Sequence, residues 1–241
     1  MTLAGHGVIA QEQTMNGHDF TFCGTRCIAL PSGALFLPGK GVLCVSDLHL
    51  GKSDRIARRN GVMLPPYEVQ ETLEKLETDI AATDPVTVIC LGDSFDDLQA
   101  AQSLHDDMRL RLVGLQAGRK WVWIEGNHDP GPVDLGGTHL AQITITRLTF
   151  RHIATDAVAE VSGHYHPKHR VAGRSRPAFI HDTQRMILPA YGAYTGGLSS
   201  EAPDLRHLFG AQAIAILTGK KAIPVPIPEN PPPARPRGRF C

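Results

Sequence analysis

Five short motifs in this chain carry side chains that bind divalent cations. As candidate ligands they supply two carboxylates, three or four imidazoles and an amide, which are the oxygen and nitrogen donors found around such ions. A supply of this size is sufficient for two cations at one site, and two-metal sites mostly cleave phosphate esters. In chain order the motifs are Asp47-Leu48-His49, Gly92-Asp93, Gly126-Asn127-His128-Asp129, a single His152, and Gly163-His164-Tyr165-His166.

The chemistry follows from the charge of the two ions. Two cations about 3.5–4 Å apart hold a hydroxide between them and lower the pKa of its parent water to about 7. A carboxylate between two cations can bridge them and offset part of their repulsion. Asp93 is the candidate bridge, and Gly92 before it lets the backbone approach the ions closely. His128 follows the ligand Asn127 and is the candidate general acid, and Asp129 is expected to orient its imidazolium.

The first three motifs each follow a compact apolar run that predicts a buried strand, at 41–45, 86–91 and 121–124. Apolar residues at helical spacing separate these runs, from Val69 to Ile80 and from Ala101 to Leu115. Alternation of strands and helices predicts a parallel sheet with helices against it. The ligands then follow the carboxyl ends of the strands, where open α/β sheets bind their ligands.

The rest of the chain predicts further strands with no long helix between them. Residues 19–30 and 34–37 suggest a hairpin around Pro31-Ser32-Gly33, and 142–149 alternates apolar and polar residues as a half-buried strand does. Two facing mixed sheets with helices outside account for both halves of the chain. We expect one domain, 18–223, between a loose segment, 1–17, and a disordered Pro/Arg-rich tail, 224–241. Short strands are also expected at 157–161, 170–172, 178–181 and 186–188.

Composition excludes several classes of protein. The 24 basic residues balance the 24 acidic ones, so no global charge attracts nucleic acid or a membrane. The five cysteines are odd in number and form no C-x-x-C pair, which argues against a disulfide framework and favours a reducing compartment. No apolar run approaches the roughly 20 residues of a membrane span. We therefore expect a soluble cytoplasmic protein.

The order of the five motifs resembles that of the calcineurin-like metallophosphoesterases, over about residues 40 to 200. The resemblance implies a four-layer α/β/β/α sandwich. Three longer stretches look like the ligase-associated PdeM-type endonucleases, in which the run Gly92-Asp93-Ser94-Phe95-Asp96-Asp97 would often hold a histidine in place of one aspartate. These stretches are 46–52, then Arg58-Arg59-Asn60-Gly61 with Leu64-Pro65-Pro66, and Leu188-Pro189-Ala190-Tyr191-Gly192-Ala193-Tyr194-Thr195-Gly196-Gly197-Leu198.

The resemblance implies a ligand set. The first metal would take Asp47, His49, Asp93 and His166, while the second would share Asp93 and add Asn127, His152 and His164. His139 competes with His152 for the fourth motif. Mn²⁺ is the ion that the PdeM-type resemblance favours, although the mixed donors also suit Zn²⁺, iron or Mg²⁺.

The same resemblance implies Mn²⁺-dependent hydrolysis of phosphodiester bonds in DNA, with functional links to a DNA ligase and a helicase in DNA repair. Arg58 and Arg59 follow the first ligand loop, and Lys168 and Arg170 follow the last ligand pair, so all four are candidates for substrate binding. With Arg174 and Arg176, the latter two form a basic cluster, for which a solvated hairpin is the alternative. Tyr191 and Tyr194 are candidates for base stacking, with core packing as the alternative.

Two other functions stay open. One is a pyrophosphatase acting on a nucleotide-linked lipid precursor, although that branch typically carries arginine where this chain has His128. The other is a binding scaffold that keeps the fold and has lost catalysis, as the retromer subunit of this superfamily has.

Overall fold

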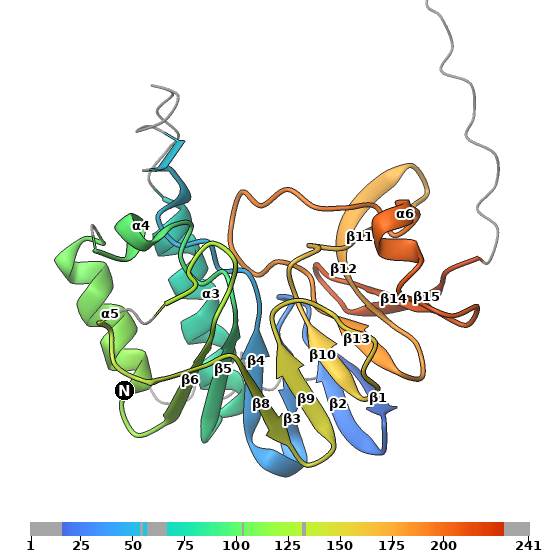
Figure 1. Ribbon diagram of the computed structural model, residues 1–241, viewed down its shortest axis with the longest axis horizontal. Helices are drawn as coiled ribbons and strands as arrows, with labels where there is room; N and C mark the ends of the chain where they lie inside the picture. The colour runs from blue at the N-terminus through green and yellow to red at the C-terminus, as the bar shows by residue number, and fades with distance from the viewer. Residues whose placement is uncertain (1–15, 54, 57–66, 103, 132–133, 229–241) are drawn as a thin grey trace, which may run out of the picture.

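The computed structural model describes residues 16–53, 55–56, 67–102, 104–131 and 134–228 (Figure 1). Its first sheet contains seven strands that neighbour one another in chain order. The first four pair antiparallel, and the pairs from β4 to β7 are parallel. The strands are β1 (His18–Phe22), β2 (Thr25–Ala29), β3 (Leu35–Leu37), β4 (Val42–Val45), β5 (Thr87–Leu91), β6 (Lys120–Ile124) and β7 (Thr138–Leu140).

The second sheet has eight strands and is mixed. Its centre is parallel, since β10 pairs parallel with both β9 and β13. The order is β15-β14-β12-β13-β10-β9-β8, with β11 added beside β12. The strands are β8 (Gln142–Ile145), β9 (Leu148–Arg151), β10 (Glu160–Ser162), β11 (Lys168–Val171), β12 (Arg174–His181), β13 (Arg185–Ile187), β14 (Ile214–Leu217) and β15 (Ile223–Pro226).

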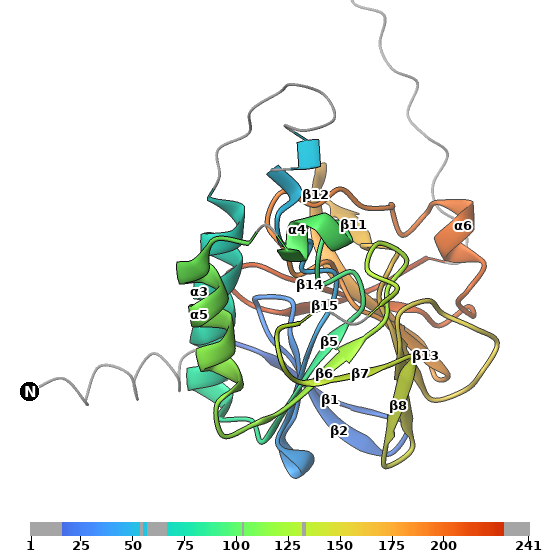
Figure 2. The same ribbon diagram turned by 60° about the vertical axis from the view of Figure 1, so that its left-hand side comes forward.

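Helices cover the outer faces of the two sheets (Figures 1 and 2). The largest is α3 (Glu68–Thr83), which buries Leu73, Leu76 and Ile80 and ends where Asp84 takes a left-handed conformation. The helix α5 (Asp106–Gln116) lies beside α3, and the short α4 (Leu98–Gln102) lies above the strands in Figure 2. The helix α6 (Pro203–Arg206) lies outside the second sheet, and a 3₁₀ turn η1 (Pro38–Lys40) precedes β4.

Alternation along the central strands assigns each side chain to a layer. In β5 and β6, Val88, Cys90 and Trp123 face the helices, whereas Ile89 and Val122 face the second sheet. Strands buried on both faces are continuous apolar runs, as β4 to β6 are. The predicted four-layer sandwich is confirmed, with α6 and its neighbouring loops as the outer layer on the second sheet.

Several predicted elements have different bounds. The single helix expected from Ala101 to Leu115 is two helices, because the chain is extended at His105 (φ −54°, ψ 142°). The strand expected over 142–149 is the hairpin β8–β9, which turns where Thr146 has φ +57°. The tail expected to be disordered from residue 224 begins instead as β15, which pairs with β14 as far as Pro226. The segment 1–15 and the residues after 228 lie outside the described residues.

Candidate metal centre

The predicted ligands follow strands whose carboxyl ends face the same way. Asp47 and Asp93 come two residues after the parallel strands β4 and β5, and Asn127 follows β6. In the second sheet, His152 comes directly after β9 and His164 two residues after the parallel strand β10. Both sheets therefore present their ligand loops at one end of the sandwich.

The first group of donors contains Asp47, His49 and His166, whose ligand atoms lie within 4.8 Å of one another. Nε2 of His166 lies 3.1 Å from Oδ1 of Asp47 and 3.3 Å from Nε2 of His49. Nδ1 of His49 donates to the carboxylate of Asp96 at 2.9 Å, which leaves Nε2 of His49 free to bind a cation.

The second group contains Asp93, His152 and His164, again within 4.8 Å of one another. Nε2 of His152 lies 3.3 Å from Oδ2 of Asp93 and 3.0 Å from Oδ1 of Asn127. Nδ1 of His152 donates to the carbonyl oxygen of Leu91 at 3.0 Å, so Nε2 is the nitrogen available for a cation. His139, the competitor of His152, lies on β7 with its ring stacked on Trp123.

Backbone hydrogen bonds join the two groups. The N–H of His49 donates to the carbonyl oxygen of Asp93 at 2.9 Å, and the N–H of His164 donates to both carboxylate oxygens of Asp47. The N–H of His128 donates to Oδ1 of Asp93 at 2.9 Å. Hydrogen bonds therefore connect the ligand loops to one another.

Many of the ligands also have an unusual backbone conformation. A left-handed φ is costly for any residue with a Cβ atom, and such residues cluster at functional sites. Five of the predicted ligands have it: Asp47 (φ +52°), His49 (+46°), Asp93 (+46°), His164 (+71°) and His166 (+47°).

Both carboxylates of the centre are held in the ionised form. Burial acts to raise the pKa of Asp93, but hydrogen bonds from His152 and from the N–H of His128 outweigh it and lower the pKa to about 2. Burial likewise opposes the lowered pKa of Asp47, which the hydrogen bond from His166 outweighs. Among the described residues, the ion pairs of these two carboxylates are with histidines alone, so their charge suits divalent cations.

His128 lies beside the first donor group, with its ring centroid 5.3 Å from that of His49. Its Nδ1 donates to the backbone carbonyl oxygen of Asp96 at 2.9 Å. The expectation that Asp129 orients this imidazole is wrong. Asp129 is buried, and its two carboxylate oxygens accept hydrogen bonds from the backbone N–H groups of Ser94, Phe95 and Gly126.

A family comparison agrees with this geometry. The family model described as calcineurin-like phosphoesterase matches residues 41–196, which is more than half of the chain. The chain belongs to this family. It is therefore a metallophosphoesterase, a hydrolase of a family that uses divalent metal ions. The two donor groups described above are its candidate metal ligands, and His49, Asp96 and His128 form a third group of donors beside them.

Among solved structures, Pseudomonas putida nuclease MPE has the same fold as this phosphoesterase. The two chains are 24% identical and superpose with a TM-score of 0.71, over 87% of this chain and 100% of that chain. None of the curated proteins matches the sequence. Within the described residues of the phosphoesterase, no helix is long and apolar enough to cross a membrane.

Of the four predicted substrate-binding residues, the structure describes only Lys168 and Arg170. Arg58 and Arg59 lie outside the described residues. In the β11–β12 hairpin, His169 pairs with Arg176 and Val171 with Arg174, so these arginines share a face. Lys168 and Arg170 alternate with those β11 residues and lie on the opposite face, so the predicted basic cluster is divided. The ε-ammonium of Lys168 donates to the carbonyl oxygen of Thr195.

Asp96 is a site residue whose contacts the sequence did not indicate. Its buried carboxylate accepts from His49 and pairs with Arg55, while its carbonyl oxygen holds His128. It therefore positions one candidate ligand and the candidate acid together. The only indication of this role in the sequence is that Asp96 lies three residues after the predicted ligand Asp93.

The segment 188–198 supports the first ligand loop. The N–H of Tyr191 donates to the carbonyl oxygen of Ser46 at 2.7 Å, and the N–H of Gly192 donates to that of Asp47 at 3.0 Å. Tyr191 is fully buried and its hydroxyl donates to Asp79, which is core packing and not base stacking. Tyr194 is 53% exposed.

Replacing Gly192 with alanine is expected to deform this loop. The added Cβ would lie 2.0 Å from the carbonyl oxygen of Leu48, which is backbone and cannot rotate away. We expect a loss of about 1–3 kcal/mol in the free energy of unfolding, as for other overpacked sites. Thermal unfolding and Mn²⁺ titration measure the two effects. Gly196→Ala is the matched control, since no atom lies within 4 Å of its Cβ position. If Gly192→Ala and Gly196→Ala have the same stability and the same Mn²⁺ affinity, Gly192 is not needed for the shape of this loop.

Lys75 gives the stability of the phosphoesterase a defined pH dependence. Its ammonium lies 3.8 Å above the Tyr191 ring, and burial lowers its pKa from 10.5 to about 8. Between these values the unfolded chain binds the proton and the folded chain does not, so stability should rise with pH. The free energy of unfolding, relative to that of Lys75→Met, should rise by at most about 1.4 kcal/mol per pH unit. Chemical denaturation of both metal-free proteins from pH 8 to 10.5 tests this, and parallel curves would contradict it.

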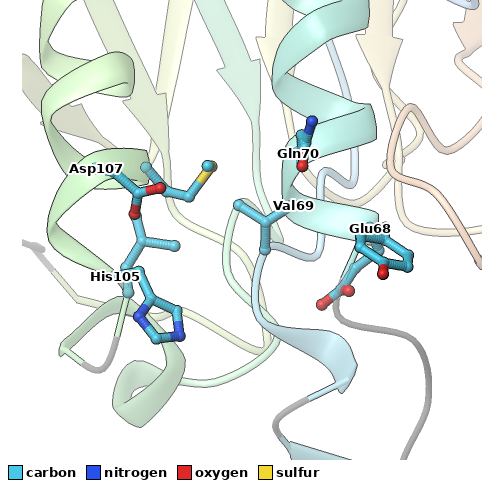
Figure 3. Close-up of a pocket in the computed structure, with 8 residues that line it drawn as sticks. Glu68, Val69, Gln70, His105 and Asp107 are labelled. Carbon is cyan, nitrogen blue, oxygen red and sulfur yellow. The ribbon is translucent and has the colours of Figure 1, made fainter.

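A separate cavity of about 330 Å³ lies between the first turns of α3 and α5 (Figure 3). Glu68, Val69, His105 and Asp107 are among its lining residues, and none of the predicted site residues lines it. One carboxylate oxygen of the buried Glu68 accepts the N–H of Ser53 at 3.0 Å. This wall of the cavity therefore supports the segment that follows the first ligand loop.

Proposed function

We propose that this phosphoesterase is a two-metal phosphodiesterase that cleaves nucleic acid, with DNA as its substrate. The observation that carries the proposal is the pair of donor groups joined through Asp47 and Asp93, with His128 beside them. The completeness of the donor set favours an enzyme over a scaffold, and His128 favours a phosphodiesterase over the pyrophosphatase branch, which typically carries arginine at that position.

We assign Asp47, His49, Asp93 and His166 to the first metal ion, and Asp93, Asn127, His152 and His164 to the second. Mn²⁺ is the ion we propose, on the PdeM-type resemblance. When bound, the ions supply an activated water for attack on phosphorus and neutralise charge on the phosphoryl oxygens. The bridging role of Asp93 is supported by its position: Oδ2 faces His152 of the second group, while its backbone carbonyl accepts from His49 of the first.

His128 is proposed to protonate the leaving oxygen. A carbonyl oxygen only accepts hydrogen bonds, so the contact with Asp96 fixes the proton of His128 on Nδ1. The imidazolium form then carries its second proton on Nε2 and can give it to the leaving alkoxide. After the transfer, the neutral ring keeps its hydrogen bond to Asp96 and its orientation.

DNA is proposed because the stretches 46–52 and 188–198 resemble the PdeM-type endonucleases and because a structure of the same fold is that of a nuclease. Functional links to a DNA ligase and a helicase, and a cytoplasmic place in DNA repair, follow from the same resemblance and belong to the proposal.

A substrate panel in the presence of Mn²⁺ tests this function. It compares bis-nitrophenyl phosphate, nitrophenyl phosphate, single-stranded and double-stranded DNA, and a nucleoside diphosphate ester, each with and without EDTA. We expect EDTA-sensitive cleavage of the diesters and of DNA. Cleavage of the diphosphate ester alone would favour the pyrophosphatase, and failure to bind Mn²⁺ would favour the scaffold.

A further inference from the structure

We propose that a groove between the β11–β12 and β14–β15 hairpins binds a single strand of nucleic acid next to the metal centre. This inference rests on the proposed function and adds a binding surface to it. The two hairpins are neighbours in the second sheet, because β12 pairs with β14 (Figure 1). The groove has a volume of about 710 Å³.

Cations dominate the charge of this groove. Arg174, Arg176, Lys220 and Lys221 line it, and no acidic side chain does. Within the part of the chain that the structure describes, none of the four forms an ion pair. Unpaired like charges repel one another, and a chain of closely spaced anions removes that repulsion on binding.

The remaining surface of the groove is apolar. Val171 and Ile223 line it and are 38% and 44% exposed, and Leu217 and Val225 lie beside them. A polymer that fits both properties carries regular anions on one side and flat apolar groups on the other. Single-stranded nucleic acid does so, whereas a duplex hides the faces of its bases in the stack. An acidic peptide offers the charge without the flat rings.

The groove lies where a nucleic-acid strand bound at the metal centre could continue into it. β11 begins two residues after the candidate ligand His166. Arg176 is paired with His169, three residues after that ligand, so at most about 10 Å of chain separates the ligand from His169, and Arg176 lies about 5 Å further, on the neighbouring strand. Arg174 lies further along the same face, towards the hairpin turn.

The test uses EDTA-treated full-length protein and a fluorescent oligo(dT), with binding measured by anisotropy over a range of salt concentrations. The groove variant is Arg174→Ala with Lys221→Ala, both exposed side chains. The matched control is Arg147→Ala with Lys40→Ala, which removes the same charges at the β8–β9 turn and η1. Hydrolysis of bis-nitrophenyl phosphate, which is too small to reach the groove, reports on the metal centre in both.

We expect the groove variant to bind the oligonucleotide at least tenfold more weakly, with a salt slope smaller by about 1.4, since each lost contact to a single strand removes about 0.7. The control should bind as the unmodified protein does. If the groove variant and the control variant bind the oligonucleotide equally well, the proposal that this groove binds it is wrong. Displacement of the oligonucleotide by poly-glutamate at equal charge would also overturn it, in favour of an acidic peptide. The proposed function fails separately, if unmodified protein loaded with Mn²⁺ leaves both the diester and DNA intact.

Discussion

Replacing Asp93 with asparagine should reduce the metal content below two ions per chain and remove most phosphodiesterase activity. The amide keeps the shape of the side chain and can still accept the N–H of His128, so the fold should survive. What it loses is the negative charge, which we expect both ions to share. Loss of a residue that only supports a ligand costs 10–100-fold in metal affinity, so this change should cost at least about 100-fold.

Metal analysis by mass spectrometry and a Mn²⁺ titration of activity measure the effect of Asp93→Asn. Asp84→Asn is the matched control, because Asp84 is exposed and holds a left-handed conformation that asparagine tolerates well. A variant at position 93 that still holds two ions per chain would refute the shared ligand.

Removing the imidazole of His128 is expected to slow the hydrolysis of esters according to their leaving group. An alkyl or DNA leaving oxygen needs a proton, so His128→Ala should lower its turnover by about 10²–10⁴-fold. Nitrophenolate leaves without a proton and should be affected far less. The metal ligands are untouched by the change, so the metal content should remain that of the unmodified enzyme.

Turnover numbers for alkyl and nitrophenyl diesters, measured on the same preparation with metal content determined, decide the role of His128. His207→Ala controls for loss of a histidine, because His207 is exposed on the segment after α6. If both esters slow equally, His128 acts on metal binding or on positioning and is not the acid.

Part of the candidate donor set can be grouped from the sequence alone, because Asp47, Asp93 and Asn127 each follow an apolar strand by two or three residues. Once β4, β5 and β6 are recognised, the parallel order brings Asp47, Asp93 and Asn127 to one edge without further information. The choice of His152 over its competitor His139 is less secure from the sequence, since a single histidine after β9 carries no spacing pattern. The contacts of His152 with Asp93 and Asn127 depend on how the two sheets face each other.

The expectations that went wrong all depend on tertiary structure. The role given to Asp129 assumed that neighbours in sequence contact each other, whereas its carboxylate reaches back to the amides of Ser94 and Phe95. The sequence predicts one basic cluster after His166 because it does not give the turn of the β11–β12 hairpin or its register. One residue of register decides on which face of a strand a side chain lies. The sequence does not predict the strand β15, because Pro224 and Pro226 are typical of a disordered tail. An edge strand nevertheless tolerates proline.

The left-handed conformation of the ligand residues sets a limit on how this protein can change. Each such residue costs the folded chain about 1–2 kcal/mol before any ion arrives, which selection for stability alone would remove. Glycine would relieve the cost at any of these positions and would delete the donor at the same time. Thermal tolerance and metal affinity therefore compete at Asp47, His49, Asp93, His164 and His166. Improvements in heat resistance, in the laboratory or over evolution, should accumulate elsewhere in the sandwich.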